Sequence, residues 1–388
     1  VQAVMIGTTH FTNAFVEAKR LIPTAAVRLG LPATKSLPPL IDWPERIRGA
    51  VGAKAYLCHG GHEFDGRAIS SLDHDELRRV AEDIARSGLQ SIAISSVFSP
   101  VNAEFELEAA EILGSELPGL PITLSHELGR MGLLERENAA VMNACLRGLA
   151  THIVGAFGSA LAESGIDAPI YLSQNDGTLM TVEFAERYPV ATFASGPTNS
   201  MRGAAFLSGE ENCAVVDIGG TTADIGMLQN GFPREASVAV RVGGVRTNFR
   251  MPDVLSLGIG GGSLVQQGKE TTVGPESVGF ELTSRARVFG GDTLTASDLA
   301  VADGRASFGD GTRVADLDRS VVRAALAWVE RQIAEAVDRM KTSPDPIPVV
   351  LVGGGSVLLR DELEGASTVL RPEHFGVANA IGAAIAQV

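Results

Sequence analysis

The sequence has 388 residues, of which 45% are hydrophobic and 20% charged, as expected for a soluble globular protein with two or more domains and a large core. The formal net charge of −14 excludes a nucleic-acid or anionic-membrane surface as the main binding face, because those partners require concentrated Lys and Arg. A nucleotide needs only local hydrogen-bond donors and is not excluded.

Cysteine content and hydropathy indicate the cellular compartment of the protein. The three scattered cysteines, Cys58, Cys145 and Cys213, do not make a disulfide framework, which favours a reducing compartment. No apolar run approaches the roughly 18–20 residues of a membrane span, and no secretory signal opens the chain. We therefore expect a cytoplasmic protein without membrane contact. Because the chain opens at Val1 inside an apolar stretch, we also expect further sequence upstream.

Strands and helices are predicted to alternate over the first third of the chain. Apolar runs predict strands at 1–6, 55–58, 91–98 and 122–125. Apolar residues at three- and four-residue spacing predict helices at 14–20, 73–87 and 102–113. The prolines between 23 and 44 predict an irregular connection. This order is typical of an α/β domain with mainly parallel strands, and we place a domain boundary near Ser125, dividing the chain into 1–125 and 126–388.

Polar turns follow two of the predicted strands, where ligand contacts gather in α/β sheets. The first turn contains His10 and Asn13, and the second contains Asn175. Both turns are equally compatible with helix caps. Further along, Arg246 is a candidate ligand for a carboxylate or phosphate, with a surface ion pair as the alternative.

Two other groups of polar residues receive no functional assignment. Cys58, His59, His62 and Glu63 are metal-ligand types, but the sequence offers no second Cys-x₂-Cys pair, so we do not predict zinc. Arg136 to Asn138 open a helix predicted at 133–164, where charged residues are usually solvated.

The most informative motif is a glycine turn between two predicted strands. An apolar strand runs into Asp217, a turn with two glycines and two threonines follows, and Asp224 opens the next strand. The turn residues are Gly219, Gly220, Thr221 and Thr222. Such a turn presents N–H groups and hydroxyls that can cradle a phosphate, and the carboxylates can hold hydrated Mg²⁺ or orient water. An ordinary hairpin is the alternative interpretation.

Two further glycine runs support the phosphate interpretation. One spans 258–263, and the other follows an apolar strand at 349–352 and consists of Gly353, Gly354, Gly355 and Ser356. Small residues at 203–205 and 380–383 predict two helices that cross closely between two lobes.

Together these motifs resemble the hydantoinase/oxoprolinase A-subunit family, within the wider actin, sugar-kinase and Hsp70 fold. The resemblance is carried by Gly7–Asn13, Arg136–Asn138, Ser195–Pro197, Asp217–Thr222, Gly260–Ser263, Gly274–Pro275 and Val377–Ala384. It implies an α/β protein with two ribonuclease-H-like, actin-like ATPase lobes around a nucleotide cleft. The family's first phosphate hairpin would precede Val1, so we expect this chain to lack it.

The resemblance also implies a function, which is the ATP-dependent ring opening of hydantoin, 5-oxoproline or a related lactam after phosphorylation of the carbonyl oxygen. ATP and Mg²⁺ would be the cofactors, and a hydantoinase B-type subunit a partner. Asp217 would hold Mg²⁺, with Asp224 as a second catalytic residue. The turn 219–222 would bind phosphates and the run 353–356 would lie by the adenosine. Substrate contacts are predicted at His10, Asn13, Asn175 and Arg246.

Three alternatives use the same phosphate-binding turn. The chain can be an ATP-dependent carboxylase component or a small-molecule kinase, which differ only in the acceptor. In a different class, it can be a nucleotide-binding regulatory module that changes lobe closure without turnover. A homo-oligomer is compatible with each of them.

Overall fold

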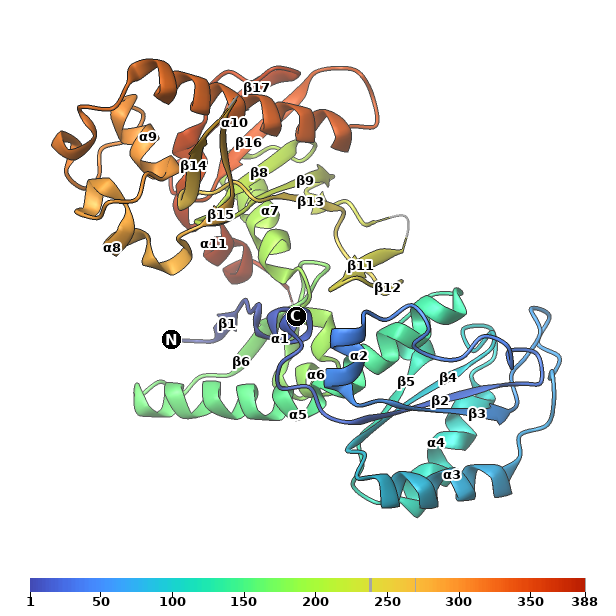
Figure 1. Ribbon diagram of the computed structural model, residues 1–388. Helices are drawn as coiled ribbons and strands as arrows, with labels where there is room; N and C mark the ends of the chain where they lie inside the picture. Colours follow the sequence, from blue (N-terminus) through green and yellow to red (C-terminus); the bar gives the residue numbers. More distant parts are fainter. Residues whose placement is uncertain (237–238, 269, 388) are drawn as a thin grey trace.

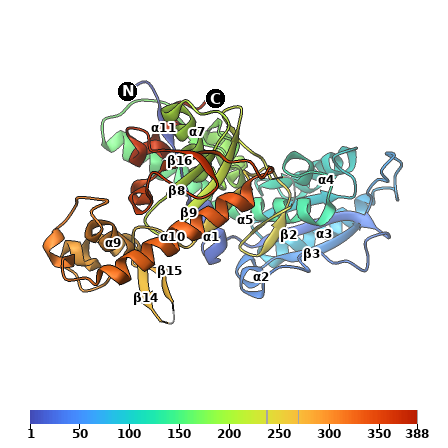
Figure 2. The same ribbon diagram turned by 90° about the horizontal axis from the view of Figure 1, so that it is seen from above.

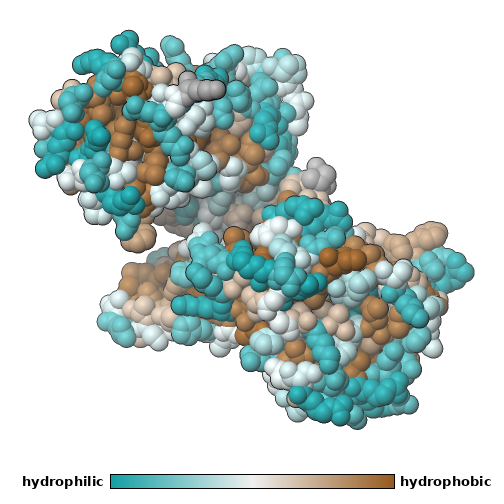
Figure 3. Space-filling view, in the orientation of Figure 1, coloured by the Kyte–Doolittle hydropathy of each residue, from teal (hydrophilic) through white to brown (hydrophobic). Residues whose placement is uncertain are grey.

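The computed structural model describes residues 1–236, 239–268 and 270–387, which form two bodies joined through a narrow middle (Figure 1). In the space-filling view a deep indentation separates these bodies (Figure 3). The parallel sheet of the N-terminal region and the segment around α9 (Ala296–Ala302) lie at opposite ends of the molecule (Figure 2). We call the body that contains the phosphate turn the upper lobe, as it is drawn in Figure 1.

The N-terminal region contains a four-stranded, fully parallel sheet of order β3-β2-β4-β5. Its strands are β2 (Thr24–Leu31), β3 (Lys54–His59), β4 (Ser91–Ser96) and β5 (Ile122–Leu124). Its helices are α2 (Glu45–Val51), α3 (His74–Ser87) and α4 (Glu104–Glu116). The predicted parallel α/β arrangement is confirmed, but the prediction of an irregular connection over 23–44 is wrong, because its first part is the central strand β2.

Alternate residues of β2 explain how this sheet is packed. Ala25, Val27 and Leu29 join the core formed with α3 and α4, whereas Ala26 faces the core around the long helix α5 (Leu133–Glu163). Burial on both faces is typical of a parallel strand, and it accounts for a strand without alternating polarity.

Helix α5 crosses the middle of the molecule. In the described part of the chain it alone is long and apolar enough to span a membrane, so the expectation that no apolar run is long enough was wrong. However, 56% of its most apolar stretch is buried inside the protein, which accounts for its composition as a core helix.

A small mixed sheet lies beside α5 and carries the start of the chain. β1 (Val4–Ile6) pairs in parallel with β6 (Ile170–Ser173), which pairs antiparallel with β7 (Leu179–Thr181). The flanking helices are α1 (His10–Glu17) and α6 (Val182–Arg187). The first strand therefore pairs across residue 125, and the division of the chain at that point stays a prediction.

The upper lobe is built on a six-stranded sheet in which β10-β9-β8-β16-β17 are neighbours and β13 pairs with β9. Its strands are β8 (Ala214–Ile218), β9 (Ala223–Gln229), β10 (Phe232–Pro233), β13 (Val254–Leu257), β16 (Ile347–Val352) and β17 (Ala366–Leu370). The β14 (Ser263–Gln267) and β15 (Thr271–Ser277) hairpin accompanies it. The other hairpin, β11 (Val240–Val242) with β12 (Val245–Thr247), packs on α5 instead, with Val242 and Val245 in the core around that helix. The helices of the upper lobe are α8 (Leu282–Arg285), α9 (Ala296–Ala302) and α10 (Arg319–Met340). The apolar stripe of α10, which includes Val322, Leu326 and Ile333, is buried.

Two helices rich in small residues cross where the bodies meet, as predicted. They are α7 (Ser195–Ser208) and α11 (Ala378–Ala384). A Cβ added at Gly203 would lie 1.9 Å from the carbonyl oxygen of Ala378, and one at Gly382 would lie 1.8 Å from that of Asn199. Only glycine permits backbones to approach this closely.

This crossing gives a first testable prediction. Gly382→Ala should destabilise the protein by about 1–3 kcal/mol, because the methyl group overlaps the backbone of α7. The matched control is Gly155→Ala on α5, where nothing lies within 4 Å of the added Cβ. We expect that control to be stabilising by about 0.5–1 kcal/mol. Urea unfolding of both variants checks the pair, and equal midpoints would contradict the close crossing.

Candidate functional site

The predicted phosphate turn is a tight hairpin between β8 and β9. The N–H of Gly219 donates to the carbonyl oxygen of Thr222 at 2.9 Å, and Asp217 faces Asp224 in the register of the two strands. The apolar residues of both strands are buried in the core of the upper lobe. This packing fixes the two carboxylates at the root of the turn.

The second glycine run, residues 258–263, packs against the turn and bonds to it. The N–H groups of Gly261 and Gly262 donate to the carbonyl oxygens of Gly219 and Gly220, at 3.0 and 2.7 Å. A Cβ at Gly260 would lie 2.5 Å from the nitrogen of Thr221, so this position requires glycine. The carbonyl groups of Gly219 and Gly220 therefore already have donors within the protein.

The turn also presents hydrogen-bond donors. Within the described part of the chain, the N–H groups of Gly220, Thr221 and Thr222 have no protein acceptor, and the two threonines are exposed. No atom lies within 4 Å of a Cβ built at Gly220. N–H groups without a protein acceptor, together with exposed hydroxyls, are the donor set that a phosphate requires.

The third glycine run, residues 353–356, packs against Asp217 and the start of the same turn. Gly353 has a φ of 80°, and a Cβ there would lie 2.3 Å from Oδ1 of Asp217. A Cβ at Gly355 would lie 2.7 Å from the carbonyl oxygen of Gly219, whereas Gly354 faces open space. Ser356 is buried beneath the run, and its hydroxyl has no partner among the described residues. The structure thus brings all three glycine runs together.

The two aspartates have an electrostatic environment suited to a cation. Burial raises the pKa of Asp217, and the Ser200 hydroxyl offsets part of that rise. Burial also raises the pKa of Asp224, the hydroxyl of Ser256 lowers it, and the charge of Asp217 raises it further. Paired, partly desolvated carboxylates are hard oxygen ligands that gain from a bound divalent cation. The donor set therefore fits Mg²⁺.

Sequence analysis assigned no role to the residues that link this turn to the crossing helices. The side-chain amide of Asn379 donates to the Gly196 carbonyl at 2.8 Å and to Oγ of Ser200 at 3.2 Å. The amide of Asn199 donates to Ser173 at 3.0 Å. These contacts join α11, α7 and β6 beside Asp217. The small-residue faces predicted the crossing, but they gave no signal for the polar residues within it.

The four predicted substrate residues lie in three places. His10 and Asn13 line one shallow recess, and α1 begins at His10, so Asn13 lies in its first turn rather than capping it. Asn175 lines a different cleft, and its amide donates to the Arg250 carbonyl at 2.6 Å. Arg246 pairs with Glu135 at 2.8 Å, which is the ion-pair alternative. Their roles in substrate binding stay predictions.

The expectation that residues 136–138 are solvated was wrong. Arg136, Glu137 and Asn138 are at most 5% exposed. Glu137 pairs with the fully buried Arg28 of β2, and the Nε–Oε2 distance is 2.6 Å. Arg136 donates to the Ser96 carbonyl of β4, so Arg136 and Glu137 join α5 to the parallel sheet, whereas Asn138 bonds Trp43 and the Arg246 carbonyl.

The residues considered for zinc do not converge. Cys58 is buried in the core beside α3, and burial raises the pKa of its thiol to about 12. His59 instead lies near Asp73 and Glu76, with one ligand atom of each within 4.8 Å of the others. Two existing bonds explain this arrangement, since Asp73 caps α3 and Glu76 accepts from the His59 N–H at 2.7 Å.

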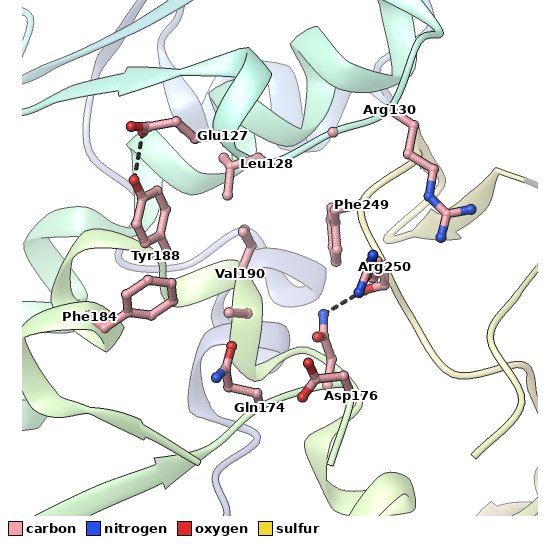
Figure 4. Close-up of a pocket in the computed structure, with 13 residues that line it drawn as sticks. Glu127, Leu128, Arg130, Gln174, Asp176, Phe184, Tyr188, Val190, Phe249 and Arg250 are labelled. Atoms are coloured by element: carbon pink, nitrogen blue, oxygen red, sulfur yellow. Dashed lines mark hydrogen bonds between the residues drawn. The ribbon is translucent and has the colours of Figure 1, made fainter. Parts of the chain in front are cut away.

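An aromatic cleft lies apart from the phosphate turn. It has a volume of about 420 Å³ and is lined by residues before α5, after β6, around α6 and at 249–250, none of which belongs to the three glycine runs. Figure 4 shows Phe184 and Tyr188 on one side and Arg130 and Arg250 on the other. The molecule therefore offers two distinct candidate sites.

Comparison with known families agrees with this arrangement. Residues 136–307 match the hydantoinase/oxoprolinase family model, and residues 1–117 match the model of the hydantoinase/oxoprolinase N-terminal region. The chain belongs to the hydantoinase/oxoprolinase family. The family match includes the phosphate turn and the second glycine run.

Two curated relatives show the range of this family. An uncharacterized protein of Methanocaldococcus jannaschii is 25% identical over all of this chain and 65% of its own length. Caprolactamase subunit alpha of Pseudomonas jessenii is 27% identical over 75% of this chain and 41% of its own length. The chain thus spans less than two thirds of the length of each of these relatives.

Solved structures share the fold. The ATP-dependent caprolactamase of Pseudomonas jessenii superposes with a TM-score of 0.77 at 22% identity, covering 97% of this chain and 61% of that one. A nucleotide-free acetone carboxylase, described as ATP-dependent, superposes with a TM-score of 0.69 at 19% identity, covering 98% and 61%. The predicted fold class is confirmed.

Proposed function

We propose that this chain is the nucleotide-binding part of an enzyme that opens a cyclic amide, such as a hydantoin, 5-oxoproline or a related lactam, at the expense of ATP. The observation that carries the proposal is the turn 219–222. The carbonyl groups of Gly219 and Gly220 accept from the second glycine run, whereas the N–H groups of residues 220–222 have no acceptor among the described residues and lie beside two carboxylates. Membership of the hydantoinase/oxoprolinase family and the likeness to an ATP-dependent caprolactamase support it.

The chemistry explains why a nucleotide is needed. A lactam carbonyl is a poor electrophile because its nitrogen donates electrons to it. ATP would transfer its γ-phosphoryl group to the carbonyl oxygen, with ADP as the leaving group. Water would then add to the activated carbon and the ring C–N bond would break, which frees the amine and leaves an acyl phosphate. A second water would hydrolyse the acyl phosphate to the carboxylate and inorganic phosphate.

The residues of this chain have separate tasks in that scheme. The N–H groups of Gly220, Thr221 and Thr222 bind phosphate oxygens and stabilise the charge that develops on them. Asp217 would hold Mg²⁺, and Asp224 would orient the nucleophile. Gly354, on the open side of the third run, leaves room for the nucleoside.

A B-type subunit is proposed as a partner, because the caprolactamase relative is itself named as an alpha subunit. A carboxylase component is the second candidate function, favoured by the likeness to acetone carboxylase over 98% of the chain. The two differ in the acceptor and in whether carbon dioxide or bicarbonate is incorporated.

The test is phosphate release from ATP and Mg²⁺ by the full-length protein, with and without a candidate B-type subunit. We expect one ring compound from a panel of hydantoins, 5-oxoproline and simple lactams to stimulate release. Stimulation that requires a ketone and bicarbonate would favour the carboxylase. Nucleotide binding without stimulated release by any compound would contradict both functions and favour a regulatory module.

A further inference from the structure

The aromatic cleft has the shape and rigidity of a small-molecule site. Its wall contains Phe184 and Tyr188, whose ring centroids are 4.7 Å apart, and Phe249 lies opposite (Figure 4). Phe184 is 44% exposed, and its ring borders the cleft. A volume of about 420 Å³ lies within the range of ligand pockets, roughly 300–1,000 Å³.

Hydrogen bonds hold this wall in place without a ligand. The Tyr188 hydroxyl donates to Glu127 at 2.6 Å, and Arg187 pairs with the same carboxylate at 2.8 Å. Asn175 ties the opposite side together through the Arg250 carbonyl. The charge of Glu127 is therefore satisfied inside the protein, and the aromatic wall is preformed.

The remaining charges at the rim are of both signs. Arg130 and Arg250 share one carboxylate, that of Glu235, at 2.8 and 3.9 Å, so the pair leaves one positive charge uncompensated. The exposed carboxylate of Asp176 accepts from the N–H and hydroxyl of Thr178, and no cationic side chain among the described residues pairs with it. Figure 4 shows Asp176 and Arg250 on the side of the cleft away from Phe184 and Tyr188.

We propose that this cleft binds a free α-amino acid with an apolar side chain. Its carboxylate would pair with Arg250, its ammonium group with Asp176, and its side chain would pack against Phe184 and Tyr188. A ligand with only one charge would leave either Arg250 or Asp176 without a partner. A ligand without an apolar side chain would leave the rings of Phe184 and Tyr188 in contact with water. The inference does not rest on the nucleotide site, because the two sites share no residues.

Calorimetric titration of the full-length protein with L-phenylalanine tests the proposal. 3-Phenylpropionate lacks the ammonium group and phenethylamine lacks the carboxylate, so each should bind about tenfold more weakly or worse. Arg250→Gln should weaken L-phenylalanine and 3-phenylpropionate alike. Asp176→Asn should weaken only the ligands that carry an ammonium group, since Asn can still accept from Thr178. Phe184→Ala should weaken all three ligands.

Matched controls lie on exposed surfaces elsewhere. Asp316→Asn and Arg323→Gln change the same charges away from the cleft and should leave binding unchanged. Asp217→Asn should also leave it unchanged, which separates this proposal from the proposed function. No heat with L-phenylalanine up to about 10 mM, or equal affinity for the three ligands, would overturn the proposal. An Asp176→Asn variant that weakens 3-phenylpropionate as much as L-phenylalanine would overturn the assigned orientation.

Discussion

Asp217→Asn should reduce phosphate release stimulated by a ring compound by at least about 100-fold, the scale of losing one preorganised electrostatic contact in an active site. Asparagine keeps the size of the side chain and one acceptor oxygen, but it removes the negative charge that would hold Mg²⁺. Nucleotide binding should largely persist, because the N–H groups of residues 220–222 are unchanged. Phosphate release and nucleotide affinity, measured on the same preparation, check this prediction.

The same substitution should raise the melting temperature at neutral pH in the absence of Mg²⁺. Burial raises the pKa of Asp217 in the folded protein above its value in the unfolded chain. Stability is therefore greatest below the unfolded pKa and decreases as the pH rises to the folded pKa, because the unfolded chain loses its proton first. Asparagine does not ionise, so Asp217→Asn does not lose stability in this way as the pH rises. The variant should therefore melt higher than the wild type at neutral pH, and the difference in melting temperature should disappear in acid.

Thermal unfolding of wild type, Asp217→Asn and the exposed control Asp316→Asn over a pH series separates two explanations for lost activity. A variant that is inactive and at least as stable as the wild type has lost a functional charge. A variant that melts lower at neutral pH has lost packing around β8, and its inactivity would not support a catalytic role. Mg²⁺ should narrow the difference in melting temperature, because the cation compensates the charge of Asp217.

The parts of the fold that sequence analysis predicted are those with local signals. The hairpin at 217–224 follows from its glycines and from the apolar strands on either side. The crossing of α7 and α11 follows from their small faces, since glycine is needed only where backbones nearly touch. The resemblance implied that the turn 219–222 and the run 353–356 meet at one nucleotide, but it did not place the run 258–263, whose N–H groups donate to the turn. The contact between the first two depends on strand order within the sheet. β8 lies between β9 and β16, which brings residues 353–355 beside the turn.

The errors concern polar residues whose partners are far away in sequence. The prolines on both sides of β2 led to the prediction of an irregular connection, although the residues between them form a central strand of the parallel sheet. Arg136 and Glu137 resembled the solvated first turn of a helix, because the residue that pairs with Glu137 lies 109 positions earlier. A single sequence gives no sign of such a pair, since each residue alone looks like a surface charge.

That pair provides the second large prediction. Glu137→Gln should destabilise the protein by about 3–5 kcal/mol, because it leaves the guanidinium of Arg28 buried without a counter-charge. Arg28 is fully buried, and Glu137 also accepts from the Ser95 hydroxyl at 2.8 Å, so the carboxylate satisfies donors from two strands. Nucleotide binding should persist below the unfolding transition, since the pair lies in the parallel sheet.

Urea unfolding of four proteins would isolate the effect of the buried charge. Replacing both partners, with Arg28→Met and Glu137→Leu, should recover much of the stability lost in Glu137→Gln, because no charge is then left unpaired. Glu82→Gln on α3 is the matched exposed control, since its 3.9 Å contact with Arg86 lies at the surface. That change should cost no more than about 1 kcal/mol. Equal losses for Glu82→Gln and Glu137→Gln would mean that water reaches the buried pair, and α5 would then be held to the sheet by its apolar contacts alone.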